Sequence, residues 1–321
     1  MRLLLFCTTL PIVLVGCSGE EVVNVEPDAK KTSFVVNELY VGTSQELQDI
    51  YFSDDNNGWA VGAYGVVVHT TNGGHDWLLQ SSGQVGYLYG LHFINPETAW
   101  VVGMSGTLLR TEDGGNLWTD TSIVAQCLMD VYRWDDYRGW AVGDSIILKT
   151  TDHGCSWDEF SYEGVVVPRL YAVWFATESR GWAVGERGCI LHTENSGSQW
   201  FPQTSHVTNP LLDVAFVDAS RGWAVGVGGM ILHTDDGGQN WSEQMSAVDV
   251  NLRGVAFQDA DNGVVVGEQG VLLTTSDGGA NWSSRDSGTD EILWSVCYSS
   301  ASTFWVASDD GVVLKVTERS N

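Results

Sequence analysis

Six short segments of the sequence share a threonine, an aspartate or asparagine, a glycine and a tryptophan at one spacing, T-x-D/N-x-G-x-x-W. Carboxylates repeated in this way could be catalytic acids or metal ligands. The carboxylate position holds Asp113, Asp152, Asp236 and Asp277, but Asn72 and Asn195 in the other two segments. An amide forms the same turn but cannot act as an acid or base. The motif is therefore predicted to be structural, and we expect no catalytic residue.

Three histidines, His69, His192 and His233, occupy one position of the repeat, just before the threonine of the motif. They fall on different repeat units, and facing sheets pack about 10 Å apart. Zinc needs ligands within about 2.1 Å, so these side chains cannot share one ion. We expect neither a metal site nor a cofactor.

Three arginines, Arg138, Arg180 and Arg221, directly precede a Gly-Trp pair in three consecutive repeats. The same position elsewhere holds Asn57, Thr98 and Asn262. Guanidinium groups aligned in this way could bind the carboxylates of an extended acidic partner segment. The alternative is that the three arginines pair with nearby acids, for which the candidates are Asp136, Glu178 and Asp218. We refer to the three arginines as the arginine stripe.

These residues sit in a repeat of about 40 residues. The motif tryptophans, at 77, 118, 157, 200, 241 and 282, are spaced by 41, 39, 43, 41 and 41 residues. A G-W-A-V-G segment or a variant of it occurs seven times, and an L-x-D/G/A/S-V segment precedes it each time. Each unit contains four short apolar runs rich in Val, Ile and aromatic residues, which read as strands. The pattern predicts an all-β, seven-bladed β-propeller with four-stranded blades over residues 34–317, with a solenoid as the alternative.

The two ends of the repeat region are expected to meet in one blade. The seventh unit stops one strand short, whereas the segment 34–42, FVVNELYVG, precedes the first unit without a blade of its own. Counting back 11 residues from Leu47 places Val36 where the missing fourth strand belongs. An N-terminal strand that completes the seventh blade would close the ring and remove two exposed sheet edges.

The N-terminus has the layout of a secretory signal: one positive charge, an apolar stretch and then small residues. The end of this stretch, Leu14-Val15-Gly16-Cys17, resembles a bacterial lipobox. We expect residues 1–16 to be a lipoprotein signal peptide, Cys17 to be lipidated, and residues 17–33 to be a polar tether. The protein would then be a membrane-anchored lipoprotein of the cell envelope, on the non-cytoplasmic side. The alternative is an ordinary signal in which Cys17 is incidental.

Charge and cysteine content narrow the range of partners. The chain has 15 basic and 41 acidic residues, a formal net charge of −26. Nucleic acid and anionic lipid headgroups would be repelled, so neither is expected as a partner. Beyond the signal, Cys127, Cys155, Cys189 and Cys297 have no C-x-x-C spacing. They predict neither a zinc site nor a particular disulfide pairing.

The T-x-D/N-x-G-x-x-W motif resembles the Asp-box, or bacterial neuraminidase repeat. Some Asp-box propellers are sialidases or xyloglucan hydrolases, so a glycan-binding protein or glycoside hydrolase is the alternative function. The F/Y-R-I-P motif of sialidases is absent, and no long insertion is available to wall a deep pocket.

The lipobox followed by in-register G-W-A-V-G and Asp-box segments resembles the photosystem II stability/assembly factor family. This resemblance implies a non-enzymatic scaffold that acts at a membrane and binds a membrane-protein subunit during assembly. An arginine patch is implicated in that family, and the arginine stripe is the candidate for it here.

Overall fold

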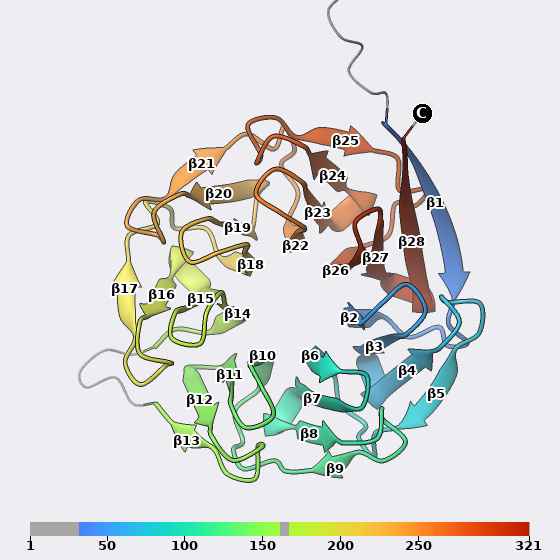
Figure 1. Cartoon of the computed structure of the whole chain (residues 1–321), viewed down its shortest axis with the longest axis vertical. Helices are drawn as coiled ribbons and strands as arrows, with labels where there is room; N and C mark the ends of the chain where they lie inside the picture. Colours follow the sequence, from blue (N-terminus) through green and yellow to red (C-terminus); the bar gives the residue numbers. More distant parts are fainter. Residues whose placement is uncertain (1–31, 161–166, 321) are drawn as a thin grey trace, which may run out of the picture.

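The structure, a computed structural model, describes residues 32–160 and 167–320, which form seven four-stranded antiparallel sheets arranged in a ring (Figure 1). Two hollows lined by the innermost strands form a central channel. This confirms the seven-bladed propeller and excludes a solenoid. None of the helices in these residues is long and apolar enough to cross a membrane. The expected signal peptide, Cys17 and most of the expected tether lie outside the described residues.

The strands fall into four layers from the channel outwards. The first layer lines the channel: β2 (Leu47–Phe52), β6 (Leu88–Asn95), β10 (Leu128–Arg133), β14 (Leu170–Phe175), β18 (Leu211–Phe216), β22 (Leu252–Phe257) and β26 (Leu293–Ser300). The second holds the G-W-A-V-G segments: β3 (Gly58–Gly62), β7 (Thr98–Gly103), β11 (Gly139–Gly143), β15 (Gly181–Gly185), β19 (Gly222–Gly226), β23 (Gly263–Gly267) and β27 (Thr303–Ser308).

The two outer layers lead into and out of the Asp-boxes. The third layer is β4 (Val66–Thr70), β8 (Leu108–Thr111), β12 (Ile146–Thr150), β16 (Ile190–Thr193), β20 (Met230–Thr234), β24 (Leu272–Thr275) and β28 (Val312–Ser320). The fourth is β5 (Leu78–Ser81), β9 (Thr119–Asp120), β13 (Asp158–Glu159), β17 (Phe201–Gln203), β21 (Ser242–Gln244), β25 (Ser283–Arg285) and β1 (Thr32–Tyr40). Five 3₁₀ turns join the second layer to the third: η1 (Ala63–Gly65), η2 (Met104–Gly106), η3 (Glu186–Gly188), η4 (Glu268–Gly270) and η5 (Asp309–Gly311).

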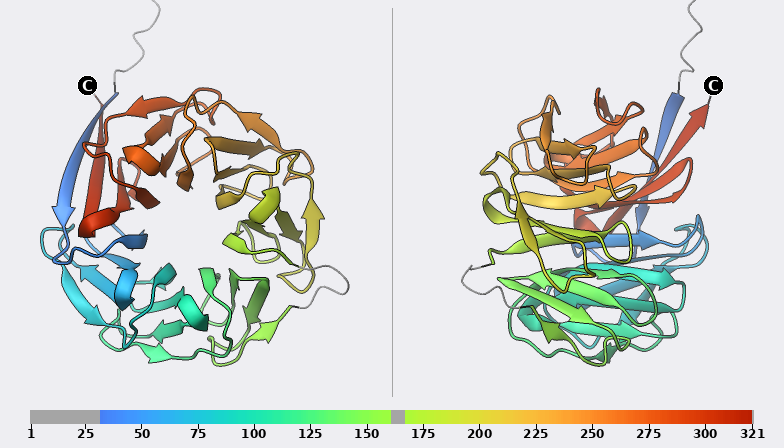
Figure 2. Two further views of the ribbon diagram at one scale, coloured as in Figure 1. Left: turned by 180° about the vertical axis from the view of Figure 1, so that it is seen from behind. Right: turned by 60° about the vertical axis from the view of Figure 1, so that its left-hand side comes forward.

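We number the blades in chain order, so that blade 1 is β2–β5 and blade 6 is β22–β25. Blade 7 contains β26, β27 and β28 and takes its fourth strand from the other end of the chain, in the order β1-β28-β27-β26. Val36 lies opposite Val316 in this pairing, which confirms the predicted ring closure. Figure 2 shows β1 and β28 running side by side at the edge of the ring. The pairing extends from Thr32 to Ser320, slightly beyond the predicted 34–317.

The turns of each blade divide the ring into two faces. The first-to-second and third-to-fourth turns meet on one face, where the amide of Gly73 donates to the carbonyl of Asn56 (2.9 Å). We call this the Asp-box face. On the other face, the 3₁₀ turns meet the connections between blades, as where Gly65 donates to Gly86 (2.7 Å). We call this the η face.

Second-layer tryptophans join neighbouring blades. Trp182 is fully buried and stacks on Phe216 of the next blade, with ring centroids 3.6 Å apart. Its Nε1 donates to the carbonyl of Gly237 in that blade's Asp-box (3.2 Å). The same stack recurs for Trp59–Phe93, Trp140–Phe175, Trp223–Phe257 and Trp305–Phe52. Each second-layer strand is enclosed between the two neighbouring blades, which explains why every residue of the G-W-A-V-G segment is buried.

Two junctions depart from this pattern. Blade 3 has Arg133 where blades 1, 2, 4, 5 and 6 have phenylalanine, and its guanidinium lies over the Trp100 ring, 4.5 Å from the centroid. Its Nε and Nη2 donate to the carbonyls of Asp135 and Asp136, so the buried cation keeps polar partners. At the junction of blades 6 and 7, Val264 replaces the tryptophan and Phe304 replaces the usual glycine. Both lie in one buried cluster, so the larger residue compensates for the smaller.

Candidate functional site

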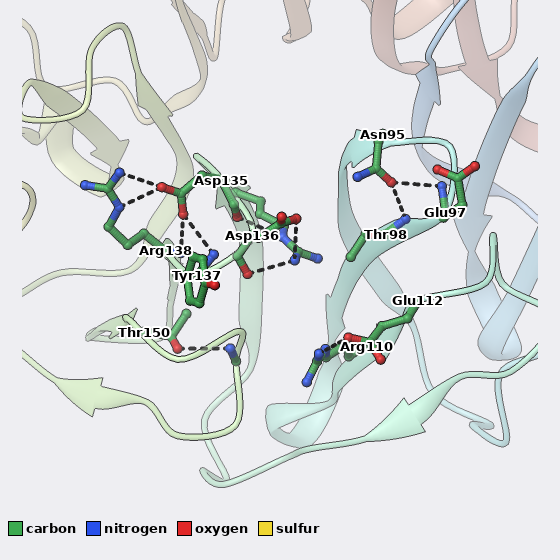
Figure 3. Close-up of polar contacts among 12 residues, drawn as sticks. Asn95, Glu97, Thr98, Arg110, Glu112, Asp135, Asp136, Tyr137, Arg138 and Thr150 are labelled. Atoms are coloured by element: carbon green, nitrogen blue, oxygen red, sulfur yellow. Dashed lines mark hydrogen bonds and ion pairs between the residues drawn. The ribbon is translucent and has the colours of Figure 1, made fainter.

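The arginine stripe lies in the first-to-second turns of blades 3, 4 and 5, on the Asp-box face. Each turn is fixed by a side chain three residues earlier in the chain. The Asp135 carboxylate accepts from the amide of Arg138 (2.7 Å), and Asp218 accepts from the amide of Arg221 (2.8 Å). Blade 2 uses Asn95 and Thr98 in the same way (2.8 Å), as Figure 3 shows beside the Asp135–Arg138 turn. The stripe positions thus lie on a repeated turn, an Asx turn at Arg138 and Arg221 and its threonine equivalent at Arg180, whose amide donates to the Thr177 hydroxyl (3.0 Å).

Every guanidinium of the stripe has a carboxylate partner. Arg138 bonds to Asp135 and to Glu178, which lies in the next blade. Arg221 pairs with Asp218 at 2.7 Å, as expected, whereas Arg180 pairs with Glu194 at 3.2 Å. Hydrogen bonds that the guanidinium groups donate to these carboxylates raise the pKa of Arg138 and of Arg221 above the usual value.

Asp136, one of the expected partners of the stripe, instead lies 4.0 Å from Arg133. Glu178, another expected partner, forms its ion pair with Arg138. The side chains of Arg138, Arg180 and Arg221 remain 28%, 43% and 46% exposed. The stripe is therefore an exposed set of locally paired charges.

The Asp-boxes have one geometry whether they carry a carboxylate or an amide. In blade 6, Asp277 accepts from the Thr275 hydroxyl (2.8 Å) and from the amide of Asn281 (2.9 Å). Asn195 in blade 4 accepts from Thr193 (3.1 Å) and from the amide of Gln199 (2.8 Å). This equivalence supports the structural role predicted for the motif.

Hydrogen bonds within the turns lower the pKa of the four Asp-box aspartates, so these groups are ionised and held in place. The second glycine of the turn is required by space as well as by its backbone conformation. Gly279 has φ +84°, and a Cβ there would lie 2.1 Å from Oε1 of Gln244.

The repeated histidines are packed separately. His69, His192 and His233 each lie over the second-layer tryptophan of their own blade, with centroid distances of 4.3, 4.8 and 4.9 Å. Burial lowers the pKa of all three, so they are neutral packing groups near pH 7.

Within residues 32–160 and 167–320, no three His, Cys, Asp or Glu side chains are grouped closely enough to hold a metal ion. The four described cysteines are free thiols.

Three aspartates that the sequence did not mark as candidate site residues lie midway along the channel: Asp49, Asp130 and Asp213. Each accepts the amide of the next residue and a second amide from the following blade. Asp213, for example, accepts from Val214 (2.7 Å) and Val255 (2.8 Å). The blade after each aspartate has a small residue at the same position: Gly90, Ala172 and Gly254. The trace of these aspartates in the sequence is the third position of the L-x-D/G/A/S-V segment, which alternates between aspartate and a small residue from one repeat to the next.

Burial dominates the electrostatics of these aspartates. Loss of hydration raises the pKa of Asp49 to about 6 and of Asp213 to about 7. The pKa of Asp130 is raised well above its usual range by burial and by the neighbouring Asp49. The carboxylates separate two parts of the channel.

The upper chamber, towards the η face, has a volume of about 400 Å³ and is lined by Tyr89, Tyr171 and Trp294. The lower chamber, of about 290 Å³, is lined by an aromatic arc of Tyr51, His92, Tyr132 and Trp174.

Comparison with known proteins places the chain in a family. The family model described as "Photosynthesis system II assembly factor YCF48" matches residues 29–126, 83–163, 123–205, 193–283 and 244–320. No curated protein matches the sequence.

Similar solved structures share the fold at low sequence identity. One described as "YCF48 bound to D1 peptide" is 20% identical with a TM-score of 0.75, over 88% of this chain and 96% of that one. YCF48 from Cyanidioschyzon merolae is 22% identical with a TM-score of 0.74, over 87% and 98% of the two chains. A virginiamycin B lyase from Staphylococcus aureus is 12% identical with a TM-score of 0.73, over 89% and 99%. Sequence identities this low establish only that the proteins share a fold. Family membership rests on the match to the family model. The chain belongs to the photosystem II assembly factor YCF48 family.

Proposed function

We propose that this protein is a non-enzymatic scaffold, anchored by lipid at Cys17 on the non-cytoplasmic side of a cell-envelope membrane, that binds a subunit of a membrane protein. Membership of an assembly-factor family supports a protein-binding role, and one YCF48 structure is described with a bound D1 peptide. The observation that carries the proposal is that the repeated carboxylates and histidines are engaged in turns and packing, which leaves exposed surfaces as the functional features.

The arginine stripe is the proposed contact for an acidic segment of the partner. Its present ion pairs are exposed, and such pairs contribute little net free energy in water. A partner carboxylate can therefore replace Asp218 or Glu194 at little cost, while bidentate geometry favours the exchange. The Asp135 and Glu178 bonds hold Arg138 more firmly because it is the least exposed of the three.

Affinity capture from solubilised membranes tests the proposal. The full lipidated chain should capture a membrane-protein subunit, and the triple variant R138Q/R180Q/R221Q should capture it at least about tenfold less well. Arg187, on the η face, provides the matched control R187Q. Equal capture by the triple variant and the wild type would exclude the stripe as the contact.

Anchoring is tested separately with Cys17→Ala. Several acyl chains hold a protein firmly at a bilayer, because each buried methylene contributes about 0.8 kcal/mol. The variant should move to the soluble fraction, and mass spectrometry of the wild type should show a lipid on the mature N-terminus. Membrane association that persists in the variant, without lipid mass in the wild type, would refute the lipobox.

A glycoside hydrolase is the second candidate function, favoured by the raised pKa values of Asp49 and Asp213 in an open channel. Against it, each of these carboxylates bridges two blades through backbone amides. Purified protein should show no turnover of sialosides or β-glucans. Turnover abolished by Asp213→Asn or Asp49→Asn in a folded variant would replace the scaffold proposal with an enzyme.

A further inference from the structure

A groove on the η face runs between blade 7 and blade 1 into the mouth of the channel. We define it as the rim groove, lined by Glu46, Tyr64, Tyr87, Glu291, Asp309 and Asp310, with a volume of about 260 Å³. Glu46 and Tyr87 also line the upper chamber, so the two hollows adjoin at these residues. Together they lead from the edge of the face towards the channel axis.

Aromatic rings follow this path. Tyr64 is 69% exposed at the tip of η1 and lies 6.5 Å from Tyr87, centroid to centroid. Tyr87 in turn stacks on Tyr89, 5.8 Å away, at the wall of the upper chamber. Trp294 lies on the same wall, and its indole donates to Asp309 (2.7 Å). Exposed and half-buried aromatic residues of this kind are enriched where proteins bind other proteins.

The charge along the rim groove has one sign. Its lining includes Glu46, Glu291, Asp309 and Asp310 and, among the described residues, neither lysine nor arginine. None of these four carboxylates forms an ion pair within the described part of the chain. Arg253, the one arginine among the described residues that line the upper chamber, is already paired with Glu268.

We propose that the rim groove and the upper chamber bind an extended protein segment that bears lysine or arginine residues on either side of an apolar one. The basic side chains would meet the four carboxylates that form no ion pair and lie against the rings of Tyr64 and Tyr87, where cations are favoured. The apolar side chain would enter the upper chamber between Tyr89, Tyr171 and Trp294. This deepens the proposed scaffold function, and it places a basic segment on the face opposite the arginine stripe.

The test uses the full mature chain and a synthetic probe, so it does not depend on knowing the natural partner. The probe is a fluorescein-labelled nonapeptide with lysines on both sides of a central leucine, and its twin carries glutamate in place of lysine. Fluorescence anisotropy should show binding of the lysine peptide that weakens as salt is raised, and no binding of the glutamate peptide. The variant E46Q/E291Q/D310N should bind the lysine peptide at least about tenfold more weakly.

A matched triple variant separates a local site from general acidity. E97Q/E159Q/E243Q removes the same number of charges at exposed positions away from the groove, and we expect its affinity to stay within about twofold of wild type. Tyr64→Ala should lower affinity by about threefold or more, whereas Tyr137→Ala, exposed on the Asp-box face, should not. Melting temperatures verify that each variant is folded.

Two outcomes would overturn the inference. One is an equal loss in both triple variants, which would mean that diffuse negative charge attracts the peptide. The other is no binding to the wild type even at low salt. Neither result bears on the capture of a membrane-protein partner, which the affinity-capture experiment tests. Each of the two proposals can therefore fail without the other.

Discussion

Val36 in β1 lies directly opposite Val316 in β28, so strands from the two ends of the described chain are neighbours in one blade. Val316 is fully buried, in a cluster that also includes Val264 of blade 6 and Phe304 of blade 7. The closing strand therefore joins the ends of the chain and also covers the junction at which the usual tryptophan is missing.

Removal of β1, residues 32–40, should lower stability sharply. The deletion exposes the edge of β28 and removes the apolar contacts of the partly buried Phe34 and Val36, for which full burial would contribute roughly 1.5–3 kcal/mol each. We expect the melting temperature to fall by about 10 °C or more. Val36→Asp should act in the same direction, whereas Glu38→Gln at an exposed position should not. Unchanged melting of the truncated protein would show that closure does not depend on β1.

Loss of an inter-blade tryptophan should also be costly. Trp182→Ala removes the stack on Phe216 and the hydrogen bond to Gly237 in the next blade. Large-to-small changes of buried aromatic residues cost about 3–5 kcal/mol, which urea denaturation measures directly. Tyr137→Ala, at a side chain that is 56% exposed, is the control and should cost less than about 1 kcal/mol. Similar losses in the two variants would contradict the role assigned to the stack.

The fold was predictable because each repeat carries its own turn and strand signals. The tryptophan spacing gave the repeat length, the seven G-W-A-V-G segments gave the blade count, and the position of Val36 relative to Leu47 gave the closure, since all three depend only on distance along the chain. The tryptophan–phenylalanine stacks were not predictable in this way. They join residues of neighbouring repeats, such as Trp182 and Phe216, and no local pattern states which faces meet.

The candidate sites were predictable only in part, for the same reason. The Asp-box aspartates were interpreted as structural because asparagine replaces aspartate in two repeats. The pairing of Arg138 with Glu178 and of Arg180 with Glu194 depends on how turns lie beside one another in space. Asp49, Asp130 and Asp213 were seen only as variants of one repeat position, because ring closure is what directs that position towards the channel.

Conversion of an Asp-box carboxylate to an amide should be tolerated. Asp277→Asn keeps an acceptor for the Thr275 hydroxyl and the amide of Asn281, as Asn195 does in blade 4. We expect a change in the free energy of unfolding within about 0.5 kcal/mol. Asp277→Ala removes the acceptor of both donors and should cost about 1–2 kcal/mol. If Asp277→Asn proved as destabilising as Asp277→Ala in urea denaturation, the carboxylate itself would be needed.

The contribution of the channel aspartate Asp213 to stability should fall as pH rises from about 4 to about 7. Burial raises the pKa of Asp213 to about 7 in the folded protein, while the unfolded chain keeps the ordinary value near 3.8. Between these values the folded state retains a proton that the unfolded state has released, so the contribution of this group to stability decreases with rising pH and is constant above about 7. The full shift corresponds to at most about 4 kcal/mol.

Asn cannot ionise, so the stability of Asp213→Asn relative to wild type should improve across this window, measured by urea denaturation at one-unit pH steps. Asp286→Asn, at an exposed turn, should show no such trend. A stability difference between Asp213→Asn and wild type that does not change from pH 4 to pH 7 would mean that Asp213 is ionised throughout and is held as a carboxylate by the amides of Val214 and Val255.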